Sequence, residues 1–75
     1  NQMKTRVLTA TFPDGEQLTR RTHRDYSHVV KIGGYVSWVG RPDLVQGRIN
    51  QIKKYGYTET PRVADVTNDP WKVAA

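Results

Sequence analysis

The chain has 75 residues, of which 36% are hydrophobic and 25% are charged, a composition that suits one small folded domain rather than a disordered chain. Its formal net charge of +5 favours polyanionic partners, and the absence of cysteine excludes disulfides, thiol nucleophiles and thiolate metal sites. No apolar run approaches the roughly 18 residues that span a bilayer, and no signal peptide is evident, so we expect a cytoplasmic protein without a membrane partner.

We expect residues 1–75 to form a single domain, with frayed tails at 1–4 and 68–75. Met3 is a candidate natural start, with Asn1 and Gln2 added before it. A core of this size supplies only about 3–5 kcal/mol, so a homodimer or another partner protein is a candidate to complete it.

The first predicted elements form a basic hairpin. Residues 5–12 alternate between an apolar face and a threonine-rich face, which predicts a half-buried strand with Leu8 and Phe12 toward the core. The sequence FPDG at 12–15 predicts a turn, because Pro presets the first corner and Gly accepts a positive φ. Residues 16–24 then carry charge on both faces, which predicts an edge strand.

The arginines of this second arm admit two interpretations. Arg20 and Arg24 point one way on the predicted strand, and Arg21 points the other way. They either protect an exposed sheet edge against unwanted pairing or grip the phosphates of a polyanion. Residues 4–24 and 41–57 each carry a net charge of +3, so the positive charge belongs to this hairpin and to a later helix.

A second hairpin is predicted between residues 26–32 and 35–39, because Gly33-Gly34 suits a two-residue turn with a positive φ at both glycines. Both faces of these strands are mixed in polarity, so either both faces are partly covered or the register differs. The expected cross-strand pairs are Ile32 with Tyr35, Val30 with Ser37, and Val29 with Trp38.

Residues 42–55 have the clearest helical pattern. Pro42 suits the first helical position, and Gly56 supplies the left-handed residue that ends a helix. We expect the apolar stripe of the helix to share one core with Leu8 and Phe12. That stripe contains Leu44, Val45, Ile49, Ile52 and Tyr55, and the opposite face contains Gln46, Asn50, Lys53 and Lys54.

Two side chains beside this helix admit alternatives. Arg48 falls inside the apolar stripe, so either its stem packs while its head reaches water, or its guanidinium is held at the sheet–helix edge for a ligand. Trp38 precedes the helix, and we expect it to be a core residue beneath the helix. An exposed stacking platform is the alternative role.

The last predicted strand covers residues 62–67, and Pro61 either places it at a sheet edge or marks its start. The sequence NDP at 68–70 is expected to end it. The predicted fold is therefore α+β, with the order β-β-β-β-α-β and one helix packed across one face of a small antiparallel sheet.

The sequence offers little for enzymatic or metal chemistry. His23 and His28 are five residues apart, which places them on opposite faces of a strand and disfavours a shared metal. Ser27 is not expected to pair with His28, because neighbouring side chains on a strand point apart. No P-loop or dinucleotide-binding motif occurs. We expect no catalytic residue, no metal site and no cofactor, and hence no enzyme.

A resemblance rests on FPDG at 12–15, an arginine-containing arm, RDYSHVV at 24–30, and SWVGRPDL at 37–44 opening the helix. This arrangement resembles small uncharacterised proteins of actinobacterial phages and mobile elements, over about residues 5–66. The resemblance implies an origin in such an element. The matching residues occupy turn, strand and cap positions, so it transfers no catalytic or binding residue.

Non-enzymatic functions remain. The first is a nucleic-acid-binding module, whose basic arm and helix follow a phosphate backbone while aromatic side chains stack on bases. The second is a protein–protein module, such as a phage inhibitor of a host or defence complex, since aromatic residues and Arg are also enriched at protein interfaces. A structural role in a phage particle is the third. The candidate nucleic-acid-binding residues are Arg20, Arg21, Arg24, Arg48, Lys53 and Lys54, and the candidate stacking residues are Tyr26, Tyr35 and Trp38.

Overall fold

The strands and the helix follow the predicted order along the chain. The computed structural model describes the backbone of residues 5–73 and the side chains of residues 5–67. The predicted tail 1–4, with the candidate start at Met3, lies outside the described residues. The protein has an α+β fold, as predicted. Its elements are β1 (Arg6–Thr11), β2 (Gln17–Thr22), β3 (His28–Ile32), β4 (Tyr35–Val39), the 3-10 turn η1 (Pro42–Leu44), α1 (Val45–Lys54) and β5 (Arg62–Val73).

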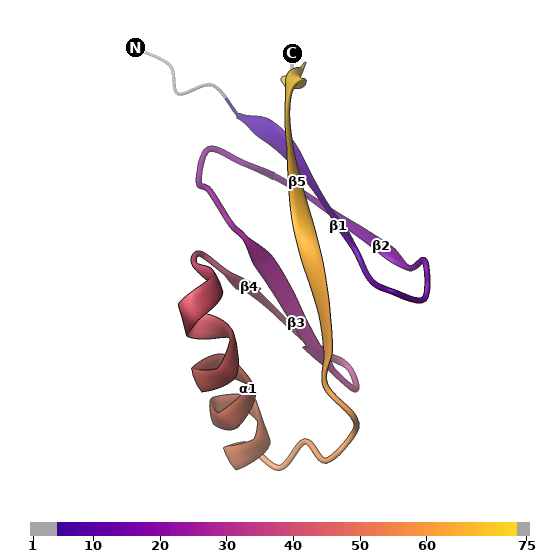
Figure 1. The fold of residues 1–75 in the computed structure, drawn as a ribbon, viewed down its shortest axis with the longest axis vertical. Coiled ribbons are helices and arrows are strands. Elements are labelled where there is room, and N and C mark those ends of the chain that lie inside the picture. Colours follow the sequence, from indigo (N-terminus) through magenta and orange to yellow (C-terminus); the bar gives the residue numbers. More distant parts are fainter. Residues whose placement is uncertain (1–4, 74–75) are drawn as a thin grey trace.

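The five strands form one antiparallel sheet in the order β2-β1-β5-β3-β4 (Figure 1). β2 is an edge strand, which confirms the prediction made from its charge. β5 lies in the centre and joins the β1–β2 hairpin to the β3–β4 hairpin. Of the two roles inferred from Pro61, the start of a strand is therefore confirmed and the edge position is wrong.

β5 is also longer than predicted, because it continues through the NDP sequence to Val73. Its pairing with β1 is regular as far as Leu8 opposite Asn68, and the register then shifts before Arg6 meets Val73. Pro70 falls inside this irregular part. A proline without an N–H is tolerated where a ladder is already interrupted. The prediction that NDP ends the strand is therefore wrong. The strand continues through NDP, with a local irregularity in its pairing with β1.

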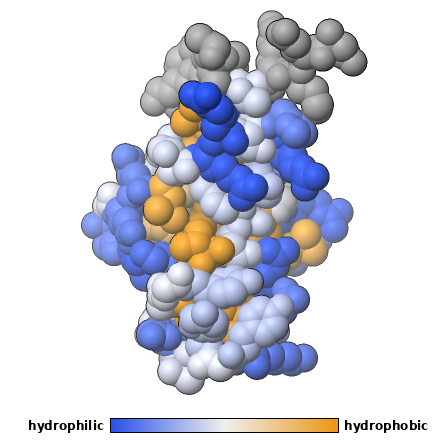
Figure 2. Space-filling model, turned by 180° about the vertical axis from the view of Figure 1, so that it is seen from behind, coloured by the Kyte–Doolittle hydropathy of each residue, from blue (hydrophilic) through white to orange (hydrophobic). Residues whose placement is uncertain are grey.

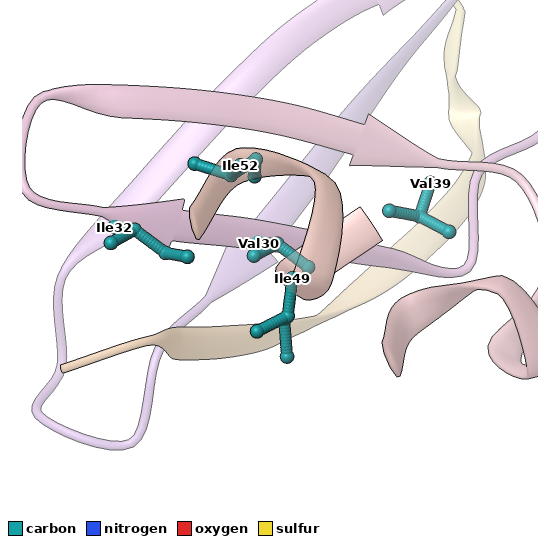
Figure 3. Close-up of a cluster of buried hydrophobic side chains, with 5 residues drawn as sticks. All are labelled: Val30, Ile32, Val39, Ile49 and Ile52. Carbon is teal, nitrogen blue, oxygen red and sulfur yellow. The ribbon is translucent and has the colours of Figure 1, made fainter. Parts of the chain in front are cut away.

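One face of the β3–β4 hairpin is covered by α1. Ile49 and Ile52 point from the helix toward the strands (Figure 3) and pack with Val30, Ile32 and Val39. These five side chains are at most 8% exposed. Full burial of such a side chain contributes roughly 1.5–3 kcal/mol relative to exposure.

No helix among the described residues covers the opposite face of the sheet. Side chains from the sheet's own strands pack against one another there. Leu18 of β2 and Trp38 of β4 pack against one cluster on this face, although β2 and β4 are the two edges of the sheet. The sheet is therefore curled, so that its edges approach each other over a shared interior. The prediction of one core common to Phe12 and the helix is wrong, because the two faces hold separate clusters. The buried members of this second cluster are Ala10, Phe12, Val29 and Ala64.

Trp38 lies on the curled face, and the expectation that it lies beneath the helix is wrong. β3 and β4 pair in the predicted register, with Trp38 opposite Val29. Side chains alternate along a strand, so Val39 faces α1 while Trp38 faces away from it. Both faces of the hairpin are covered, which explains their mixed polarity. Of the two turn glycines only Gly33 has a positive φ, at 59°, so the expectation for Gly34 is wrong.

The helix begins and ends near the predicted residues. Pro42 opens the short turn η1, and α1 follows directly. Gly56 has a φ of 103°, and its N–H donates to the carbonyl three residues earlier at 3.0 Å, which closes the last turn. Leu44 and Tyr55 are 41% and 56% exposed, so the buried stripe is narrower than predicted. No helix among residues 5–73 is long and apolar enough to cross a membrane.

A group of ion pairs fixes the tip of the β1–β2 hairpin across the sheet. The carboxylate of Glu16 lies 2.9 Å from the ammonium of Lys31 on β3 and 2.6 Å from the guanidinium of Arg62 on β5. Asp14 also pairs with Arg62, whose guanidinium lies 4.7 Å from the ring centroid of Phe12. Because β3 is adjacent to neither β1 nor β2, the contact between Glu16 and Lys31 stabilises the curl.

Glu16 is expected to make stability depend on pH. Hydrogen bonds from Lys31 and Arg62 lower the pKa of Glu16 from its ordinary value of 4.5. A carboxyl whose pKa is lowered by folding stabilises the folded state above its unfolded pKa, and the stabilisation is lost as pH falls through the folded pKa. The difference in Tm between wild type and Glu16→Gln should therefore be largest near neutral pH and shrink in acid. Glu59→Gln is the matched control, and a Glu16→Gln difference that persists in acid would contradict this account.

Candidate nucleic-acid interface

Six basic side chains among the described residues have no carboxylate partner. The ion pairs of residues 5–67 use the other described cations, Arg6, Lys31, Arg41 and Arg62. A cation whose charge no neighbouring carboxylate compensates attracts an external anion more strongly. The six without a partner are Arg20, Arg21, Arg24, Arg48, Lys53 and Lys54, the same six that the sequence predicts as nucleic-acid-binding residues.

Arg20 and Arg21 are exposed on β2, at one edge of the sheet. Arg20 stands opposite Leu8 in the register and points to the curled face, whereas Arg21 stands opposite Val7 and points to the other face. An edge with arginines on both sides resists pairing with another strand. Edge protection and phosphate binding therefore use the same residues, and they do not exclude each other.

The segment between β2 and β3 carries Arg24 and is fixed at several points. The backbone N–H of Arg24 donates to the hydroxyl of Thr22 at 3.0 Å, which turns the chain after β2. Asp25 pairs with Arg6 of β1, and the N–H of Ser27 donates to a carbonyl of β4 at 2.9 Å. Asp25, which directly follows Arg24, is therefore paired with Arg6 and not with an arginine of the arm.

Arg20 is packed on two of the predicted stacking residues. Its guanidinium carbon lies 5.1 Å from the ring centroid of Tyr26 and 5.9 Å from that of Trp38, within the range of a cation–π contact. The two rings meet edge to face, with centroids 5.7 Å apart. Tyr26 and Trp38 are both half-buried. The cluster therefore brings β2 and β4, the two edges of the curled sheet, into contact beside the arginine arm.

The third predicted stacking residue, Tyr35, lies elsewhere. It packs against the cluster under α1 and contacts Tyr55 and Tyr57, with centroid distances of 6.0 and 5.3 Å. Lys53 and Lys54 occupy the last turn of the same helix. The structure therefore divides the predicted site residues into two groups, one at β2 and one at the end of α1.

These two groups do not form one flat surface. α1 packs on β3 and β4, while β2 is separated from β3 by β1 and β5. At about 4.8 Å between neighbouring strands, β2 and β3 are roughly 14 Å apart along the sheet. Arg20 also points to the face opposite α1. A ligand bound at Arg20 therefore lies on the face of the sheet opposite the helix lysines.

Arg48 is held by the sheet. It is half-buried on α1, and its guanidinium donates to the hydroxyl of Ser37 on β4. Ser37 is only 8% exposed, so Arg48 satisfies a hydroxyl that would otherwise be buried without a partner. The guanidinium is thus fixed at the sheet–helix edge, one of the two positions inferred from the sequence, with an internal partner already in place.

The expectation that Ser27 and His28 do not pair is wrong. The Nδ1 atom of His28 lies 2.9 Å from the hydroxyl of Ser27, and its Nε2 atom lies 3.1 Å from a carboxylate oxygen of Asp65. Ser27 precedes β3, so the alternation of side chains along a strand does not apply to it. Asp65 is the cross-strand neighbour of His28 on β5, which requires the sheet order and cannot be read from sequence spacing.

The serine–histidine–aspartate contact lies at the surface on its acidic side. The Asp65 side chain is 92% exposed, so water screens its interaction with the imidazole. The described part of the chain has no pocket to hold a substrate and no group of three or more His, Asp or Glu side chains that could hold a metal. We interpret the contact as a link between β3 and β5.

Comparisons with protein-family models, with curated proteins and with solved structures find no match to this chain.

Proposed function

We propose that this protein binds nucleic acid through the exposed arm formed by Arg20, Arg21 and Arg24. The observation that carries the proposal is that no described carboxylate pairs with any of these three guanidiniums, although the other described arginines outside α1 are all ion-paired. Guanidinium groups bind phosphate oxygens through two parallel hydrogen bonds. Three of them along one edge strand and its turn fit a run of phosphates.

Phosphate contacts position a protein on nucleic acid and carry little sequence information. Binding should therefore be weakly specific, and the cytoplasm is the compartment in which we place it. Lys53 and Lys54 form a separate basic pair that we leave outside the arm site. The resemblance to phage and mobile-element proteins is compatible with such a role in an infected host.

The proposal is tested by the salt dependence of binding. Labelled single- and double-stranded DNA and RNA are titrated at two salt concentrations. Each phosphate contact contributes about −0.9 to the log–log slope on duplex DNA and about −0.7 on single strands. Arg21→Ala should reduce the slope by about one contact and weaken binding to all sequences alike. Arg41→Ala, which removes an arginine already paired with Asp43, is the matched control. Absence of salt-sensitive binding at low ionic strength would refute the proposal.

A second candidate function is binding of a partner protein at β4. This edge strand carries no charged side chain, unlike β2, and its second residue, Val36, is 39% exposed. Figure 2 shows one face of the molecule with apolar surface between flanks of hydrophilic side chains. An uncharged edge is a template for an added strand from a host protein or a second copy.

The two candidates predict different behaviour on purification. Nucleic-acid binding gives a preparation with excess absorbance at the nucleic-acid wavelength that salt removes. A partner at β4 gives instead a captured host protein, or a dimer in light scattering, that is lost in Val36→Lys because a charge then stands on the edge.

A further inference from the structure

The cluster of Arg20, Tyr26 and Trp38 goes beyond what phosphate binding requires. Phosphates need only cations, yet here one cation of the arm is stacked on two aromatic rings. Tyr26 and Trp38 are both half-buried residues, and Arg24 lies in the segment between β2 and β3 that also carries Tyr26. Aromatic faces and guanidinium planes are the surfaces on which unpaired nucleobases stack.

The loop geometry keeps Tyr26 in place. Asp25, just before it, is tied to Arg6 of β1, and Ser27, just after it, is hydrogen-bonded to β4 through its N–H and to β5 through its carbonyl. The phenol is therefore held between two anchored neighbours. A ring that is already ordered loses little conformational entropy when a base stacks on it.

We propose that the arm takes single-stranded nucleic acid, with a base stacked at the cluster of Arg20, Tyr26 and Trp38 and an adjacent phosphate on Arg24. This inference rests on the proposed function and specifies its substrate. In a duplex the base faces are hidden in the helical stack, so the aromatic pair gives a duplex no contact. An unpaired base has a free face, and every base has one, so binding tolerates sequence.

The experiment compares Tyr26→Ala and Tyr26→Phe on short single strands and on a duplex of the same sequence, with DNA and RNA arms. Tyr26→Ala should weaken single-strand binding roughly 5- to 150-fold, the effect of losing one base–aromatic stack, and leave duplex binding unchanged. Tyr26→Phe keeps the ring and should retain wild-type affinity. Tyr55→Ala is the matched control, because it removes an exposed tyrosine at the far group.

A second readout follows Trp38 directly. In a Trp71→Phe background Trp38 is the remaining tryptophan, and a base stacked beside it should quench its fluorescence. Single strands should quench it and the duplex should not. This measurement uses a protein in which Tyr26 is unchanged. It therefore still tests base stacking if Tyr26→Ala disturbs the packing of the curled face.

The outcomes separate this inference from the proposed function. Equal, salt-sensitive binding of single strands and duplex, with no quenching of Trp38 and no effect of Tyr26→Ala, would overturn the single-strand inference and leave phosphate binding by the arm intact. No binding of either form at low salt would overturn both. Preference for RNA over DNA at equal stacking would show that the ribose 2′-hydroxyl is also recognised.

Discussion

Phe12→Ala is expected to unfold most of the protein at room temperature. Phe12 is 1% exposed at the centre of the cluster enclosed by the curled sheet, and its ring also supports Arg62. Replacing a buried Phe by Ala costs about 3–5 kcal/mol, which is comparable to the whole stability expected of a domain this small. Thermal or urea unfolding followed by circular dichroism measures the effect.

Ile52→Ala is expected to cost about 2–5 kcal/mol on the other face, where Ile52 is fully buried under α1. Since the two clusters are separate, the milder changes Phe12→Leu and Ile52→Val should have additive effects on the free energy of unfolding. Leu44→Ala, at an exposed position, is the control with little effect. A large non-additive term would mean that the two faces form one core after all.

Reversing two charges of the arm is expected to abolish binding of nucleic acid. Arg21→Glu together with Arg24→Glu removes two charge-assisted contacts and adds two repulsive charges. Each charge-assisted hydrogen bond contributes about 1.5–3 kcal/mol, so the affinity should fall by roughly two to four orders of magnitude. Both side chains are exposed, so the fold should tolerate the change. Affinity is measured at low salt with the oligonucleotides described above.

The matched control is Lys53→Glu together with Lys54→Glu. It changes the net charge of the protein by the same amount, but at the end of α1 on the far group of site residues. A loss confined to the arm variant supports a local site at β2. Equal losses in both variants would mean that only the overall charge of the protein matters.

The features that the sequence predicted correctly are local ones. The edge position of β2 follows from charge on both of its faces, and the β3–β4 register follows from a two-residue turn. The end of the helix follows from Gly56. In each case the residues that decide the feature are neighbours in the sequence, so their chemistry is visible without knowledge of the fold.

The features that it missed depend on long-range pairing. The place of Trp38 depends on the curl of the whole sheet, and the contact between His28 and Asp65 depends on β5 lying beside β3. The same curl brings Arg20 into contact with Tyr26 and Trp38. The sequence predicts each of the three as a candidate binding residue, but it does not predict that they form one cluster. Tyr35 could have been separated from Trp38, because the two are three residues apart on one strand and side chains alternate between the faces of a sheet.

The central position of β5 has a consequence for synthesis of the protein. β5 is the last of the described elements to leave the ribosome, yet it is the strand that joins the two hairpins. Before it emerges, β1 and β3 each present an unpaired edge, and the cluster on the curled face lacks the side chains that β5 contributes. Exposed edges of this kind invite mispairing between nascent chains, and long-range pairing closes slowly. The arginines of β2 protect only the outer edge of the sheet. We therefore expect aggregation and chaperone binding to be most frequent before β5 has left the ribosome.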